Sequence, residues 1–288
     1  EAVSTDPMDY PAEIRGVVKD YAATETTKTV SSIWTEGDAI GVTTAAGISK
    51  ISYIMTDDRN VKYAYNAEKD VFQVVSKEGE DHTIYFKGPY TMSMTAYAPY
   101  TGERGTLAGV IQASTTSEKQ VGTARATIDF LYAEGGGSQT NPRVEFQFFH
   151  KMSQLVLAFK AGGGLELDDI SYTLKNIILD GSFDTSAGSV ASGKTTGNIN
   201  MSLAKGKEMN SSVIVFPQKL ASTLLLELAM GGKTYAQPIG NGIDLISGNT
   251  YIFDVTIAPQ SMTVSPAKIE DWIWGENSDH YVIAGESE

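Results

Sequence analysis

Short runs in which apolar and polar residues alternate recur along the whole chain. The clearest run extends from Tyr251 to Ile257, with an apolar side chain at every second position and with Asp254 and Thr256 between them. Because successive side chains of a β-strand point to opposite faces, this period of two gathers the apolar side chains on one face. The run therefore predicts a strand with one buried face.

Similar short runs predict further strands at residues 14–18, 48–55, 71–75, 83–86, 91–98, 126–132, 170–179, 212–216 and 224–230. Turn-forming pairs such as Asp180-Gly181, Gly231-Gly232 and Asn241-Gly242 separate them. Many short strands at this spacing are typical of sandwiches and barrels. The predicted fold class is all-β.

Two local assignments stay open at this level. Apolar residues alternate at 144–148 and again at 155–159, which predicts either a hairpin or one bent strand. Residues 165–179 fit a short helix as well as a strand, and the β-rich context favours the strand. The glycine-rich stretch 134–142 is the preferred domain boundary over Gly162–Gly164, which gives an N-terminal domain of residues 1–140, with its first strand at about 14–18, and a C-terminal domain of residues 141–288.

Composition narrows the function classes. The 288 residues carry 22 basic and 35 acidic side chains, a net charge of −13, and no cysteine. Such an acidic chain is unsuited to a phosphate backbone, so no nucleic-acid partner is expected. The absence of cysteine excludes thiolate sites, and no run reaches the roughly 20 apolar residues of a membrane-spanning helix. A basic, apolar leader is missing at Glu1, so we expect a mature or trimmed form.

Candidate chemistry is sparse, and no cofactor is expected. His82, His150 and His280 show no metal-ligand spacing, which predicts ordinary surface or strand-end residues. The acidic pairs Asp57-Asp58 and Asp168-Asp169 do not match a calcium loop and are interpreted as solvated turns. Three further aromatic residues could cover a core or stack on sugar rings, with core packing favoured: Trp272, Trp274 and Tyr281.

Six segments combine tryptophan, glycine, proline and aromatic residues in a characteristic order. They read WTEGDAIGV at 34–42, TAYAPY at 95–100, DFLYA at 129–133, VEFQFFHKMSQL at 144–155, VFPQ at 215–218, and LISGNTY at 245–251 followed by IEDW at 269–272. Together they resemble the fimbrillin (Mfa-like) family of Bacteroidales surface proteins, which build type V pili. The resemblance runs over nearly the whole chain.

The resemblance implies two tandem transthyretin-like β-sandwich domains in a structural or adhesive fimbrial subunit, not an enzyme. It implies export as a lipoprotein, with the outer membrane reached through a lipidated N-terminus upstream of Glu1. In this family a trypsin-like protease removes the first strand, and a strand of another subunit fills the groove. The implied partners are therefore other fimbrial subunits, that protease, and a host or bacterial surface ligand.

Carried onto this sequence, the family pattern makes Arg15 the candidate processing residue, with Lys19 and Lys28 as rivals. The alternative interpretation of Arg15 is an ordinary exposed basic residue. The candidate C-terminal donor strand consists of His280, Tyr281, Val282, Ile283 and Ala284. This run is short for a donor strand. Its length favours a tip position in the fimbria over a shaft position.

Two other function classes stay open. The tryptophans and the acidic surface suggest a surface glycan-binding β-sandwich lipoprotein. A carboxylate-dependent hydrolase would need two facing acids, which a sequence alone does not bring together.

Overall fold

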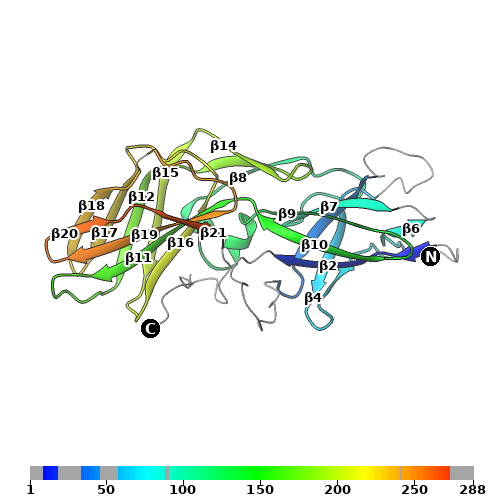
Figure 1. The fold of residues 1–288 in the computed structure, drawn as a ribbon, viewed down its shortest axis with the longest axis horizontal. Helices are drawn as coiled ribbons and strands as arrows, with labels where there is room; N and C mark the ends of the chain where they lie inside the picture. The colour runs from blue at the N-terminus through cyan, green and yellow to red at the C-terminus, as the bar shows by residue number, and fades with distance from the viewer. Residues whose placement is uncertain (1–8, 19–33, 46–57, 88–90, 241, 273–288) are drawn as a thin grey trace.

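The computed structural model describes residues 9–18, 34–45, 58–87, 91–240 and 242–272. Strands dominate this part of the chain, which confirms the all-β prediction (Figure 1). Two short 3-10 helices, η1 (Ser117–Lys119) and η2 (Gly122–Thr127), interrupt them. No helix in the described ranges has the length and hydropathy needed to cross a bilayer.

Seven strands of the N-terminal half form a sheet that closes on itself, in the order β10-β2-β5-β4-β3-β7-β9. They are β2 (Glu13–Val18), β3 (Ala39–Thr44), β4 (Val61–Asn66), β5 (Val71–Val74), β7 (Met92–Ala98), β9 (Leu131–Gly137) and β10 (Arg143–His150). Alternate side chains fill the interior, as the buried positions of β10 show. We call this closed sheet the barrel.

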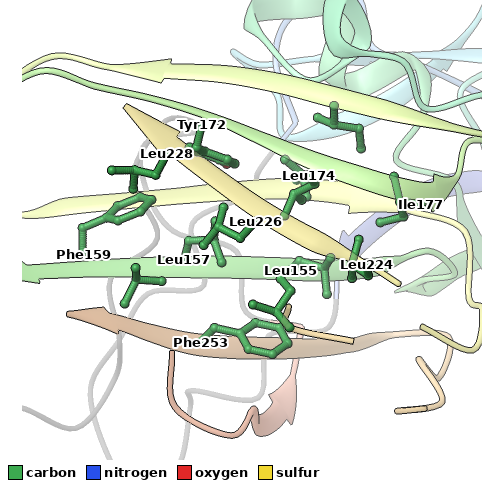
Figure 2. Close-up of a cluster of buried hydrophobic side chains, with 14 of the residues drawn as sticks. Leu155, Leu157, Phe159, Tyr172, Leu174, Ile177, Leu224, Leu226, Leu228 and Phe253 are labelled. Atoms are coloured by element: carbon green, nitrogen blue, oxygen red, sulfur yellow. The ribbon is translucent and has the colours of Figure 1, made fainter. Parts of the chain in front are cut away.

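Two sheets of the C-terminal half face each other as a sandwich. One has the order β16-β11-β19-β20, with β21 also paired to β19, and the other has the order β15-β12-β17-β18. Their strands are β11 (Ser153–Ala161), β12 (Ile170–Ile178), β15 (Thr196–Leu203), β16 (Met209–Val215), β17 (Leu225–Met230), β18 (Lys233–Pro238), β19 (Asn249–Ala258), β20 (Ser261–Val264) and β21 (Lys268–Asp271). Figure 2 shows side chains of both sheets meeting in one core, such as Leu157 and Leu226.

A smaller sheet joins the two halves, in the order β14-β13-β8. Its strands are β8 (Val110–Ser114), β13 (Asp180–Asp184) and β14 (Ser189–Ser192), and it runs along one side of the molecule (Figure 1). Beneath it lies a third apolar cluster that includes Tyr97, Phe130, Phe183 and Phe216. A separate pair, β1 (Asp9–Pro11) and β6 (Tyr85–Lys87), lies near the N-terminus.

Most of the predicted strands are confirmed, and 165–179 contains the strand β12 rather than a helix. Two predictions need correction. Residues 126–132 are not one strand, because η2 extends to Thr127 and β9 begins at Leu131. Of the two alternatives for 144–148 and 155–159, the hairpin is wrong, since β10 belongs to the barrel while β11 pairs with β16 and β19; the two runs are successive strands, separated by Lys151 and Met152. The predicted strand at 48–55 lies outside the described residues.

The glycine-rich stretch proposed as a domain boundary lies inside the barrel. Gly135, Gly136 and Gly137 belong to β9, and the chain returns through the turn at 138–141 into β10. A Cβ at Gly137 would lie 2.6 Å from the Phe86 ring, and one at Gly136 would lie 2.8 Å from the carbonyl oxygen of Met92. These glycines therefore permit close packing within the barrel, and the chain passes from the barrel into the sandwich further on, between His150 and Ser153.

Candidate assembly site

The strand β2 occupies an asymmetric place in the barrel. On one side it pairs in parallel with β10 over six residues, from Glu13 to Val18. On the other side it pairs antiparallel with β5 at one position, Ile14 opposite Phe72. Ladder hydrogen bonds resist the separation of two strands, so the junction with β5 is the weaker of the two seams.

On the inward face of β2, a glycine lies between two apolar side chains. Ile14 is buried, with 1% of its surface exposed, and Val18 is buried as well. Between them lies Gly16, where an added Cβ would be 2.8 Å from Phe148 and 3.1 Å from Phe72. The place that β2 fills, which we call the β2 slot, therefore accepts two aliphatic side chains separated by glycine.

An indole closes the β2 slot from a distant part of the sequence. The Nε1 of Trp34 donates a hydrogen bond of 3.0 Å to the carbonyl oxygen of Gly16. The same indole contacts Phe72 and Phe148 edge to face, with ring centroids 5.1 and 5.2 Å apart. Trp34 thereby fixes the middle of β2 and the two rings that flank it.

Charged residues alternate on the outward face of β2. Glu13 lies opposite Arg143 and Arg15 lies opposite Glu145, so each cross-strand pair joins opposite charges. Arg143 is already bonded to Glu145 at 2.8 Å, and within the described residues Arg15 forms no ion pair. These contacts are solvated and contribute little stability, so they favour the register rather than the affinity of the pairing.

The structure places the candidate processing residue Arg15 in the middle of β2, where it is half-buried. A protease must draw several residues of its substrate into an extended, unpaired conformation, which a strand within a sheet does not offer until it opens. Cleavage after Arg15 therefore requires β2 to detach first. Lys19, Lys28 and the candidate donor strand at 280–284 lie outside the described residues.

A second cluster, which the sequence did not reveal, lies where the chain passes from barrel to sandwich. The His150 Nδ1 is 2.7 Å from Asp129 Oδ1, and both residues are buried. The imidazole stacks on the indole of Trp272, with parallel rings and centroids 4.4 Å apart. The backbone N–H of Trp272 also donates to the carbonyl of Gly248, at 2.9 Å. The segment that leads to residues 273–288 is thus anchored at this junction.

This cluster corrects the expectation for the histidines. His150 does end β10, but it is buried rather than on the surface, and His82 is buried beside Glu80. The hydrogen bond from His82 lowers the pKa of the Glu80 carboxyl group. Both partners of the His150–Asp129 pair lie in the motif segments 129–133 and 144–155, yet no spacing rule connects them. His280 lies outside the described residues.

The remaining candidate positions supply no ligand site. Asp58 is buried rather than solvated, while the exposed Asp169 accepts a hydrogen bond from the backbone of Lys205, which links the segment before β12 to the segment after β15. Trp272 belongs to the core, which confirms core packing for that residue; Trp274 and Tyr281 lie outside the described residues. In the described part of the chain no group of three or more acidic or histidine side chains could hold a metal ion.

A closed sheet joined to a sandwich makes this chain an all-β protein with two lobes. The family model described as "Fimbrillin-like" matches residues 23–272. The chain belongs to this family, which makes it a structural protein rather than an enzyme and removes the hydrolase alternative.

Known proteins support the assignment over most of the chain. The "Putative fimbrium subunit Fim1C" of Bacteroides uniformis is 27% identical over 265 residues, which cover 86% of this chain and 82% of that protein. A crystal structure of a "putative cell adhesion protein" from Bacteroides ovatus superposes with a TM-score of 0.84 at 33% identity, covering 93% of this chain and 99% of the other. Another with that description, from Bacteroides uniformis, has a TM-score of 0.68 at 23% identity and covers 91% and 98%; it supports the fold alone.

Proposed function

We propose that this protein is a structural or adhesive subunit of a bacterial surface fimbria. Membership of the fimbrillin-like family and the similarity to a fimbrium subunit support this proposal. The subunit joins its neighbour by strand exchange at the β2 slot. The single observation that carries this step is the position of β2 between a six-residue pairing and a one-position pairing.

The energetics of the β2 slot agree with exchange rather than permanent opening. Burying Ile14 and Val18 contributes about 3–6 kcal/mol together, before the entropy of ordering the strand is subtracted. Cleavage after Arg15 releases the first half of β2, so the barrel loses the contribution of Ile14 and the edge of β10 at Arg143–Glu145 becomes unpaired. A strand of a second subunit with a similar apolar face restores both, and this is a form of strand addition.

Processing comes before exchange in this proposal. A trypsin-like protease cuts after Arg15 once β2 has opened, and the C-terminal segment 280–284 of a neighbouring subunit is the candidate donor. Because that segment is short, a tip position is favoured over a shaft position. Export as a lipoprotein and attachment to the outer membrane complete the proposal.

Limited trypsin digestion of the full chain tests the proposal. We expect a product that begins at Gly16 and forms higher oligomers in size-exclusion chromatography with light scattering. An Arg15→Gln variant controls for other cleavage sites, because it should resist this cut and remain a monomer. A product that begins at Gly16 and remains monomeric under all conditions would contradict self-assembly.

Trp272 was one of the tryptophans that suggested glycan binding. Its indole is buried against His150, so it offers no surface for a sugar ring. No described residue adds a specific observation in its favour.

A further inference from the structure

The strand β16 lies at one edge of the larger sandwich sheet. It pairs with β11 from Met209 to Val215, and in the described sheet order no strand lies on its other side. The backbone groups of Ser212 and Ile214 point to that open side, since alternate residues of a strand direct their N–H and C=O groups to opposite edges. An edge of this kind can pair with another chain.

A glutamine from the other half of the molecule occupies this edge. The backbone N–H of Ile214 donates to Gln120 Oε1 at 2.8 Å, and Gln120 Nε2 donates to the Ile214 carbonyl at 2.9 Å. The same Nε2 donates to the carbonyl of Thr115 at 3.0 Å. The side-chain amide therefore makes both hydrogen bonds that a peptide unit of an added strand would make.

An arginine side chain occupies the next outward-facing position along the edge of β16. Arg125 Nη1 lies 2.8 Å from the carbonyl oxygen of Ser212, and Nη2 lies 2.8 Å from its hydroxyl. Nη1 also donates to the Gln120 carbonyl at 3.3 Å, which ties the two covering residues together. Gln120 and Arg125 are exposed by only 2% and 7%, so these bonds are shielded from water.

A second glutamine side chain bonds to both backbone groups of a strand residue. Gln218 Oε1 accepts from the Ile178 N–H at 2.9 Å, and Gln218 Nε2 donates to the Ile178 carbonyl at 2.9 Å. A glutamine amide thus replaces a strand neighbour at the end of β12 as well. This recurrence shows that a buried amide can satisfy both groups of a strand residue in this fold.

We propose that the segment 117–127 is an edge cover, whose residues Gln120 and Arg125 prevent β16 from pairing with β16 of a second copy. The expected occupant of the uncovered edge is a second copy, because two identical edges pair antiparallel about a two-fold axis and the contact then closes as a dimer. The cover directs assembly away from this edge. The inference does not depend on the β2 slot.

A double variant of the full chain, Gln120→Ala with Arg125→Ala, tests this proposal. It removes the side chains that occupy the edge of β16 together with their polar groups. We expect a dimer in sedimentation velocity at concentrations at which the unmodified protein is a monomer. The matched control, Gln112→Ala with Lys119→Ala, changes the same number of nearby polar residues to alanine and should remain monomeric.

Adding Ser212→Pro to the double variant provides the rescue. Proline removes the outward N–H of β16 while the bonds to β11 persist, so the dimer should return to monomer. A folded double variant that remains monomeric, or a dimer that persists with Ser212→Pro, would overturn the proposal.

If the double variant does not fold, amide hydrogen exchange of the single variant Gln120→Met tests whether Gln120 protects the edge of β16. The Ile214 amide should exchange about 10-fold faster or more, whereas the Val213 amide, which faces β11, should change little. Equal exchange of Ile214 in the variant and the unmodified protein would show that Gln120 does not protect this edge.

Discussion

The indole of Trp34 donates a hydrogen bond to the carbonyl oxygen of Gly16 and so holds β2 against the ring of Phe148. The two residues are 18 positions apart in the sequence. This bond fixes the one position of β2 at which a side chain has no room. The fit of β2 in the barrel is therefore sensitive to changes at either residue.

A Gly16→Val substitution should destabilise the folded protein. The added Cβ would lie 2.8 Å from Phe148, so the rings must move, and overpacking of this kind costs about 1–3 kcal/mol. Urea unfolding followed by circular dichroism gives the free energy directly. The neighbouring Val17→Ala, whose side chain is exposed, should change it by less than about 0.5 kcal/mol. Equal effects of the two variants would mean that the β2 slot is not tightly packed.

A Trp34→Phe substitution should make Arg15 easier to cleave. Phenylalanine keeps an aromatic ring but removes the donor to Gly16, and a lost hydrogen bond is worth about 1 kcal/mol, or about fivefold in the opening of β2. The rate of the trypsin cut after Arg15, followed by mass spectrometry, measures this opening. Trp272→Phe, at the other junction, should leave that rate unchanged.

Replacement of Trp272 by alanine should strongly destabilise the junction between barrel and sandwich. The indole is buried and stacks on His150, and truncation of such a side chain typically costs about 3–5 kcal/mol. Trp272→Phe should cost less, because a ring still covers the imidazole. Thermal unfolding of both variants measures this difference. Equal decreases in the midpoint for alanine and phenylalanine would contradict a structural role of the stacked ring.

Alkaline pH should destabilise the protein through its buried tyrosines. Burial raises the pKa of Tyr97 to about 12 and raises the pKa of Tyr63 and Tyr172 as well, from an unfolded value of 10.0. Above pH 10 the unfolded chain releases protons that the folded protein keeps, so stability falls as the pH rises through that range. Each such group contributes a slope of up to about 1.4 kcal/mol per pH unit.

Urea midpoints at pH 8 and at pH 11 measure this loss. Tyr172→Phe removes one titrating group along with its bond to Ser211, so it should lower the stability at pH 8 and make the alkaline decline shallower. An undiminished decline in this variant would exclude Tyr172 as a contributor.

Sequence patterns predict this fold where one side of a strand is buried and the other is exposed. The alternation at 14–18 located β2 in this way, and the alternation at 251–257 located β19, in which buried and partly buried positions alternate from Phe253 to Ile257. Gly135–Gly137 misled the prediction, since glycine marks close packing in β9 as well as turns. Pairings over long distances, such as Asp129 with His150 and Gln120 with Ile214, leave no local pattern and emerge only in three dimensions.

The most direct test of the central claim is competition for the β2 slot by a synthetic peptide of residues 9–15, which belong to the segment that cleavage after Arg15 releases. Protein cleaved after Arg15 and depleted of its released peptide is mixed with this peptide, and its size is followed by light scattering. We expect the peptide to suppress the formation of oligomers, whereas the same peptide with Ile14→Asp, which places a charge at a buried position, has no effect. Oligomers that form equally with both peptides would contradict assembly through the β2 slot.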